Sequence, residues 1–251
     1  MSGILAGEPF GRQRLDQMYR VASERGYRSA IFGEEDTSVT PWILWRHDVD
    51  LELAAVRPMA ELEAGLGVRS TYFFMTASWF YNLLSQEGRS TVRHVLDHGH
   101  AVGLHCDLAI ARDGSLADAD IVRRVERDFD LLETAYPRMF QRLVSFHNPA
   151  DAVLQREFES FYSTYQPKFF SDVKYLSDSN RVWREGPPEQ WFDPRRHPRI
   201  SILLHPELWA YPGADMPEGM RGYLAERETK TRAMLEHDQI PLSPTAPAAE
   251  R

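Results

Sequence analysis

The sequence predicts an α/β fold in which a parallel sheet or barrel is built from alternating strands and helices. Short apolar runs rich in strand-forming residues alternate with segments whose apolar residues recur at helical spacing. At 251 residues the chain is within the range of a single α/β barrel. Several of the runs end directly at an aspartate or a histidine. In such folds, ligands and catalytic groups collect at the carboxyl ends of the strands.

The predicted strands are short runs of apolar, β-branched or aromatic residues. They cover residues 42–45, 70–75, 101–104, 143–146, 169–173 and 199–204. The predicted helices carry an apolar stripe and end near Gly or Pro. They cover 13–26, 51–67, 90–97 and 118–136, and a charged helix after residue 223 is expected to cover the fold. We expect one barrel domain over residues 1–240, with 1–40 as an N-terminal helical extension and 241–251 as a disordered tail.

The composition argues against several classes of protein. The formal net charge is -8 and no long block of Lys and Arg is present, so binding to nucleic acid has no electrostatic support. Cys106 is the only cysteine, which excludes a disulfide framework and favours a reducing compartment. The first residues lack the basic start and apolar core of a signal peptide, and no apolar run approaches ~20 residues. We therefore expect a soluble cytoplasmic protein without a transmembrane segment.

The strongest local signal lies where the apolar run 42–45 stops at the polar segment 46–50. If the chain is still extended there, Asp48 and Asp50 point to the same side. Two facing carboxylates repel one another unless a cation or a shared proton separates them. The segment indicates a metal site or a carboxylate acid/base pair, with His47 as a supporting residue or alternative ligand. The competing interpretation is an Asp-rich turn that caps the following helix.

Three histidines follow later predicted strands in the same way: His105, His147 and His205. The carboxyl ends of parallel strands share one face, so these side chains and the two aspartates can converge although they are far apart in sequence. A single histidine after a strand is more often a hydrogen-bonded core or loop residue. The repeated pattern nevertheless predicts a shared metal or acid/base site.

The ligand types narrow the choice of metal. Aspartate oxygen and histidine nitrogen without cysteine suit zinc or another divalent transition metal, such as cobalt or nickel, in an open catalytic site. Magnesium or calcium would require more oxygen ligands. Asp107 lies two residues after His105. It is either a ligand, a residue that holds His105 in the right tautomer, or an ordinary loop or cap aspartate.

Four segments follow one another in order: RHDVD at 46–50, GHAVGLH at 99–105, SFHNP at 145–149 and LLHP at 203–206. Taken together they resemble the ordered motifs of the polysaccharide deacetylases, the carbohydrate esterase family 4 or NodB-homology group. The resemblance implies a distorted (β/α) barrel, a divalent metal and removal of N- or O-acetyl groups from amino sugars. It also implies a role in cell-surface glycan or lipopolysaccharide assembly rather than secreted chitin deacetylation.

The resemblance also implies roles for individual residues. Asp48 resembles the catalytic base and Asp50 the metal-binding aspartate. His105 resembles the first metal-binding histidine, and His205 resembles the histidine that acts as general acid. Asp178 resembles the aspartate that tunes the catalytic groups, and its alternative interpretation is an ordinary Ser-Asp-Ser turn.

Two positions depart from the family's pattern. The second metal histidine usually follows the first by four residues, where this chain has Ala109. The third motif usually offers an arginine, where this chain has His147. Two protein ligands would make a poor zinc site, because catalytic zinc normally has three plus water. We therefore expect either His147 or Asp107 to complete the site.

The expected reaction is metal-assisted hydrolysis of an amide or ester on a carbohydrate. Asp48 would take a proton from water and His205 would protonate the leaving group. Asn148 is a candidate to share the oxyanion charge, and Trp79 and Trp183 are candidates to stack on sugar rings, although packing is the commoner role for such residues. Two alternatives stay open: hydrolysis of a non-acetyl C–N bond such as a formamide, and an inactive sugar-binding homologue.

Overall fold

The computed structural model describes residues 10–35, 41–108 and 116–240. Within these ranges eight strands form one sheet, in the order β6-β5-β4-β3-β2-β8-β7 with β1 alongside β2. All neighbouring strands are parallel. The strands are β1 (Arg28–Ala30), β2 (Trp42–Val49), β3 (Thr71–Phe74), β4 (Ala101–Cys106), β5 (Leu143–Phe146), β6 (Tyr162–Ser163), β7 (Lys174–Ser177) and β8 (Arg199–Leu204). The predicted α/β class with a parallel sheet is confirmed.

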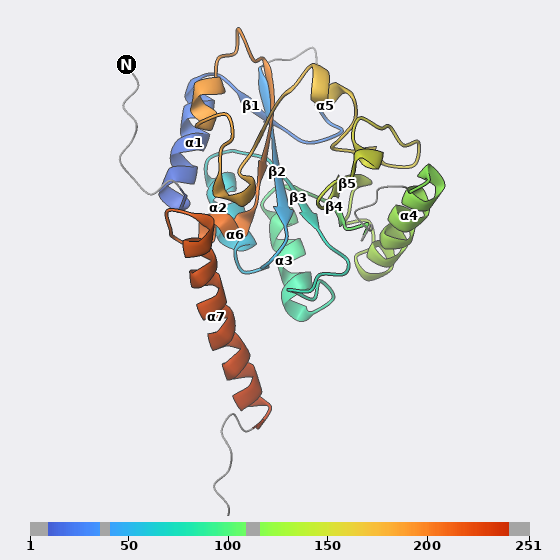
Figure 1. Cartoon of the computed structure of the whole chain (residues 1–251), viewed down its shortest axis with the longest axis vertical. Helices are drawn as coiled ribbons and strands as arrows, with labels where there is room; N and C mark the ends of the chain where they lie inside the picture. The colour runs from blue at the N-terminus through green and yellow to red at the C-terminus, as the bar shows by residue number, and fades with distance from the viewer. Residues whose placement is uncertain (1–9, 36–40, 109–115, 241–251) are drawn as a thin grey trace, which may run out of the picture.

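Helices pack around this sheet (Figure 1). They are α1 (Arg12–Glu24), α2 (Val56–Gly65), α3 (Gln86–Asp97), α4 (Asp118–Ala135), α5 (Lys168–Ser171), α6 (Pro206–Ala210) and α7 (Met216–His237). Short 3-10 turns occur at Asp151–Val153, Ser179–Arg181 and Pro188–Trp191. Among the described residues, no helix has both the length and the hydropathy that crossing a bilayer requires.

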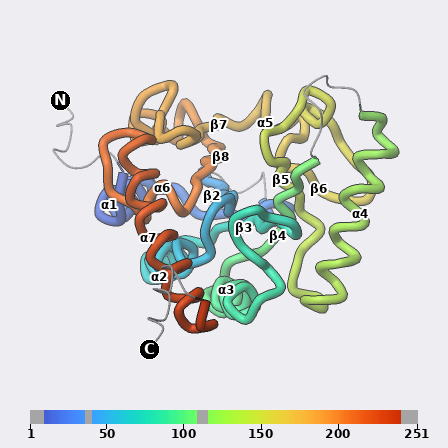
Figure 2. Tube along the Cα trace, turned by 60° about the horizontal axis from the view of Figure 1, so that its bottom comes forward, coloured from blue at the N-terminus to red at the C-terminus, as the bar shows by residue number. Residues whose placement is uncertain are grey.

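The sheet curls into an incomplete barrel. Figure 2 shows the strands following a curve from β7 through β2 to β6, with α5 near the gap between the two ends. Phe169 of α5 contacts Tyr162 of β6, with ring centroids 6.1 Å apart, and it is buried in the same apolar cluster as Trp42 and Leu44 of β2. In the described part of the chain, the barrel is therefore closed by packing rather than by strand pairing, which is the predicted distorted (β/α) barrel.

Strand β2 is the centre of the sheet and alternates between two buried environments. Trp42 and Leu44 belong to the cluster inside the barrel, whereas Ile43 and Trp45 belong to the larger core beneath the helices. Successive side chains of a strand point to opposite faces. The interior face of β2 therefore continues through Arg46 and Asp48 toward Asp50, and all eight residues of the strand are buried.

Interior packing also explains why β4 carries a glycine at position 103. A Cβ atom added to Gly103 would lie 2.7 Å from the Phe73 ring and 2.9 Å from the Leu143 carbonyl oxygen. Only glycine lets β3, β4 and β5 approach this closely.

Several predicted elements differ from the structure. Residues 169–173 were expected to form a strand, but 169–171 belong to the short helix α5, from which Phe169 packs into the barrel interior. The helix after residue 223 was expected to cover the fold, and this is wrong. It begins at Met216, and every residue from 224 to 240 except Leu235 is exposed. The short strands β1, β6 and β7 were not predicted, because two to four residues carry little periodicity. The tail 241–251 and Ala109 lie outside the described residues.

A buried polar cluster lies between β2 and α2, outside the barrel. The carboxylate of Glu63 accepts hydrogen bonds from His47 (2.6 Å), Ser70 (2.6 Å), Tyr72 (2.7 Å) and Tyr19. Burial alone would raise the pKa of Glu63, but the neighbouring His47 and these hydrogen bonds lower the pKa to about 2. A carboxylate with four donors is well satisfied, whereas the same donors without it would be buried and unpaired.

We therefore predict that Glu63→Ala lowers the free energy of unfolding by about 3 kcal/mol, as expected when one partner of a buried polar network is removed. Urea denaturation followed by circular dichroism measures this loss. The matched control is Glu61→Ala on the exposed face of the same helix, for which we expect a change below about 0.5 kcal/mol. Equal losses in the two variants would contradict the assigned role of Glu63.

Candidate metal and acid–base site

The Asp48 carboxylate is fixed on the interior face of β2 by a neighbouring arginine. Arg46 Nε donates to Asp48 Oδ1 at 3.1 Å and Arg46 Nη2 donates to Oδ2 at 2.8 Å. Ser145 Oγ donates to Oδ2 at 2.8 Å. Burial alone would raise the pKa of Asp48, but the charge of Arg46, followed by that of His105, lowers it below its ordinary value. Asp48 is thus held ionised and in one orientation.

Arg46 is itself anchored across the barrel. Its Nη1 donates to Thr164 Oγ1 at 2.9 Å and its Nη2 donates to Tyr165 Oη at 2.7 Å. Its guanidinium carbon lies 4.8 Å from the centre of the Tyr165 ring. Arg46 is absent from the predicted site residues, although its place two residues before Asp48 on one strand is the signal that puts both on the same face.

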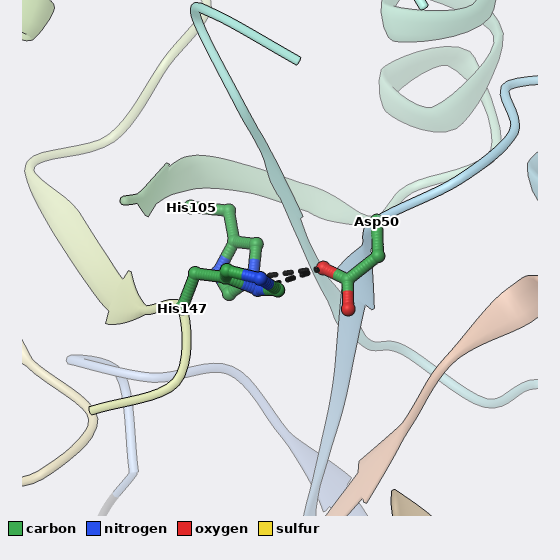
Figure 3. A group of neighbouring side chains, drawn as sticks. All are labelled: Asp50, His105 and His147. Atoms are coloured by element: carbon green, nitrogen blue, oxygen red, sulfur yellow. Dashed lines mark hydrogen bonds and ion pairs between the residues drawn. The ribbon is translucent and has the colours of Figure 1, made fainter. Parts of the chain in front are cut away.

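Asp50, His105 and His147 converge from three strand ends (Figure 3). Their potential ligand atoms all lie within 4.8 Å of one another. His105 Nε2 is 3.0 Å from Asp50 Oδ1 and 3.1 Å from His147 Nδ1, and His147 Nδ1 is 3.4 Å from Asp50 Oδ1. Asp107 is not a member of this group.

The tautomer of His105 directs a lone pair into this group. His105 Nδ1 lies 2.9 Å from the backbone oxygen of Ser145, which can only accept, so Nδ1 carries the proton. When the ring is neutral, its unprotonated Nε2 faces the Asp50 carboxylate. Two lone-pair atoms 3.0 Å apart repel one another unless a proton or a cation lies between them. This is the arrangement of a histidine ligand whose second nitrogen is held by a backbone carbonyl.

The donor set fits a divalent transition metal. Asp50 Oδ1 is buried and has no hydrogen-bond partner among the described residues, in spite of its short contacts to both histidines. Burial would raise the pKa of Asp50, but the contacts with His105 and His147 lower it well below its ordinary value, so the carboxylate is ionised. One carboxylate and two imidazoles match the ligand number and type of open zinc sites.

Asn148 supports the third member of the group. Its side-chain amide nitrogen lies 2.9 Å from His147 Nε2. The oxygen and nitrogen of an amide are nearly interchangeable in shape, so a turned amide oxygen accepts a hydrogen bond from Nε2–H and leaves the His147 Nδ1 lone pair free for a metal. Asn148 itself has a positive φ of 43°, which a non-glycine residue adopts at the cost of backbone strain.

His205 follows β8 and is paired with Asp178. Its Nδ1 lies 2.6 Å from Asp178 Oδ1, and its backbone N–H donates to Asp178 Oδ2 at 3.0 Å. Trp209 Nε1 also donates to Oδ2, at 2.8 Å. Burial alone would lower the pKa of His205, but the charge and hydrogen bond of Asp178 raise it to about 10. His205 Nε2 faces Asp50 Oδ2 at 3.8 Å. This geometry keeps the imidazole protonated and aims its free N–H at the site.

Glu207 is a second acid that the motifs do not identify. It lies two residues after His205 in α6, it is 1% exposed, and its Oε2 has no hydrogen-bond partner among the described residues. Burial, followed by the charge of Asp50, raises the pKa of Glu207 above its ordinary value. Both effects favour the neutral carboxylic acid.

One cavity of about 960 Å³ joins these groups. Its lining includes Asp48, Asp50, His105, His147 and His205, as well as Asn148 and Trp183. The five residues that were predicted to converge therefore line one cavity. The volume is at the upper end of the range for small-ligand sites.

Besides Asp107, two further predicted residues are not part of this site. His47 was expected to support the site or to act as an alternative ligand, and this is wrong. It points to the opposite face of β2, is fully buried, and contacts Glu63 instead. The reason is the strict alternation of side chains along the strand. Trp79 lies outside the cavity lining and is 94% exposed.

No family model matches the chain, and no curated protein matches it in sequence. Among solved structures it is similar to the chitin deacetylase of the fungal pathogen Colletotrichum lindemuthianum, at 16% identity over 65% of this chain and 73% of that chain, with a TM-score of 0.40. A family 4 carbohydrate esterase from Bacillus anthracis matches at 11% identity over 93% and 89%, with a TM-score of 0.43. A CE4 family pseudoenzyme from Bacillus anthracis matches at 15% over 74% and 61%, with a TM-score of 0.44. The last two bear the name of the family that the four motifs resemble.

We predict that Asp178→Asn lowers the pKa of His205 from about 10 toward its ordinary value of ~6.5, because the substitution removes the carboxylate charge. NMR titration of the His205 ring in metal-free protein measures this change. The raised pKa contributes stability that is fully present below pH ~6.5 and is lost as the pH rises through about 10. The variant should therefore lose stability mainly at neutral and acidic pH. Asp172→Asn, at an exposed position nearby, is the control, and an unchanged His205 titration in Asp178→Asn would refute the pairing.

Proposed function

We propose that this chain is a divergent polysaccharide deacetylase of carbohydrate esterase family 4, which uses a divalent metal to hydrolyse an N- or O-acyl group, most simply acetyl, on an amino sugar or glycan. The observation that carries the proposal is the meeting of Asp50, His105 and His147 in one cavity beside Asp48 and His205. The cavity thus combines a metal-competent donor set with one ionised carboxylate and one protonated imidazole. These are the parts that metal-assisted acyl hydrolysis requires.

Asp50 Oδ1, His105 Nε2 and His147 Nδ1 are the atoms that would hold the metal. When bound there, a cation such as zinc supplies a Lewis acid that polarises the acyl oxygen and makes water a stronger acid. Asp48 accepts the proton of the attacking water, since its carboxylate is ionised and lines the cavity. Arg46 keeps that carboxylate in place while its charge changes.

His205 donates a proton to the departing amine or alcohol. Its pKa of about 10 means that the imidazole carries this proton at neutral pH, before the C–N or C–O bond breaks. Asp178 then stabilises the ring and fixes which nitrogen points to the substrate. The environments of Asp48 and His205 shift their pKa values in opposite directions, so one accepts a proton and the other donates one.

The proposal also includes the metal, a residue that contacts the sugar, the compartment and the cellular process. Zinc is the metal that two imidazoles and one carboxylate suit best among common cellular ions, with cobalt or nickel as substitutes. We assign Trp183, which lines the cavity, to stacking on a sugar ring. Cys106, the only cysteine, is buried and free, which fits a reducing compartment such as the cytoplasm. A cytoplasmic step in cell-surface polysaccharide or lipopolysaccharide assembly is the process that we assign.

A panel of amino sugars that differ only in the N-acyl group tests the function. Protein loaded with zinc is incubated with N-acetyl and N-formyl sugars, and the released acetate and formate are quantified. Acetate release that a chelator abolishes and zinc restores is the expected result. Release of formate alone would replace the acetyl assignment with the alternative of deformylation. No release from any substrate by fully metal-loaded protein would contradict an enzymatic function and favour the inactive sugar-binding alternative.

We predict that Asp48→Asn and His205→Gln each lower kcat at least ~10²-fold, since each removes one proton-transfer group. Both variants should retain the metal content of the parent protein, because neither residue belongs to the group of three. Elemental analysis and stopped assays of acetate release measure the two quantities. His237→Gln in the exposed helix α7 should leave both unchanged. Unaltered turnover in either cavity variant would remove that residue from the mechanism.

A further inference from the structure

The segment after β7 forms an outer wall of the cavity and is held in a strained conformation. Asn180 and Arg181 both have positive φ angles, 60° and 56°. Such a conformation is unfavourable for non-glycine residues, and two in succession persist only where surrounding contacts enforce them. Ser177, Ser179 and Asn180 line the cavity here, followed by Trp183 and Arg184.

The contacts of Arg181 explain how the strain is sustained. This residue is 5% exposed, and its guanidinium donates to the carbonyl oxygens of Tyr211 at 2.9 Å and Gly213 at 2.8 Å. It also lies over the Phe10 ring, at 4.8 Å from the ring centre. Arg181 therefore fastens the segment to the body of the protein, on the side away from the cavity. Asn180, before Arg181, and Trp183 and Arg184, after it, line the cavity.

Arg184 is a cationic side chain on this wall without a counter-charge. Of the charged side chains that line the cavity within the described ranges, Asp48 pairs with Arg46, and Lys174 pairs with Glu185 at 2.5 Å. Arg184 lines the same cavity, is exposed, and makes no ion pair or hydrogen bond in the described part of the chain. In a protein with a formal net charge of -8, acidic partners are not scarce. An unpaired guanidinium at a ligand cavity is available to a ligand.

We propose that the wall formed by residues 177–186 is a subsite for an oxyanion carried by the substrate, with Arg184 as its principal contact. This inference rests on the proposed function and narrows it: the acylated sugar carries a phosphate or carboxylate group. A guanidinium offers a planar fork of donors that matches both groups. The Ser177 and Ser179 hydroxyls, 2.6 Å apart, and the Asn180 amide supply neutral donors on the same wall. Trp183, between them and Arg184 in sequence, offers an apolar face to the sugar ring.

The cavity has room for such a substrate. About 960 Å³ exceeds what a single acylated sugar ring occupies, so the cavity can take the sugar together with a charged substituent. The metal-competent and acid–base groups follow the strand ends, whereas Arg184 belongs to the segment after β7, and all of them line the same cavity. A substrate that contacts both regions would place its acyl group at the strand ends and its oxyanion at Arg184.

Binding to metal-free and zinc-loaded protein tests the subsite by isothermal titration calorimetry. The probes are N-acetylglucosamine, its 1-phosphate, the corresponding nucleoside-diphosphate sugar, and a uronic acid of the same ring size. We expect at least one anionic probe to bind about tenfold more tightly than the uncharged sugar, as one charge-assisted contact allows. Arg184→Gln should abolish this preference without weakening the binding of the uncharged sugar, and Arg184→Lys should keep part of it. Which anionic probe shows the preference identifies a phosphomonoester, a diphosphate or a carboxylate as its source.

Arg93→Gln, at an exposed position on α3 outside the cavity lining, is the matched control and should retain the full preference. Equal binding of charged and uncharged sugars, or a preference that survives Arg184→Gln, overturns the inference. So does a failure of every anionic probe to bind. Acyl hydrolysis is measured separately with the same probes. An intact anion preference without hydrolysis would leave the subsite standing and contradict the proposed reaction, so the two failures are distinguishable.

Discussion

The alternation of side chains along β2 is the constraint on which the rest of the site depends. A strand turns each successive residue to the opposite face, so Arg46, Asp48 and Asp50 share the barrel interior while His47 is turned toward α2. Parallel pairing with β3 and β8 fixes the register of β2 in the sheet. The same pairing brings the carboxyl end of β2 level with the carboxyl ends of the neighbouring strands. A shift of one residue would place His47 in the cavity and bury both aspartates under the helices.

Of three buried acids in or beside the cavity, two have a fixed positive partner. Asp48 is held by Arg46, Asp178 is held by His205, and Asp50 is placed between two histidines whose lone pairs face it. Removing charges from water is costly, and the cost is offset only where each charge meets a fixed counter-charge or hydrogen-bond donors. Asp50 lacks such a partner when His105 is neutral, because the ring then offers it a lone pair and not a proton. A divalent cation would supply the missing positive charge.

Local pattern was enough to predict the parallel α/β class and the strand ends at which polar residues gather. It could not decide the third member of the metal group, since His147 and Asp107 both follow strand ends and only the path of the chain separates them. The role of Arg46 depends on its contacts with Asp48 and Tyr165. Tyr165 lies 119 residues after Arg46, so local pattern could not predict that contact. Helix α7 has an ordinary helical pattern, yet from Leu224 onward nearly all of it is exposed. Its contacts with the body of the protein there include polar ones, from Arg227 to the Phe80 carbonyl and from Lys230 to Glu52.

The central claim is that three side chains from three strand ends hold one cation. Diffraction data collected on either side of the zinc absorption edge, from crystals grown with zinc, test it most directly. The account predicts one strong anomalous peak within ~2.0–2.2 Å of Asp50 Oδ1, His105 Nε2 and His147 Nδ1. A fully zinc-exposed crystal with no peak there, or with the ion bound through Asp107 in place of His147, would contradict it.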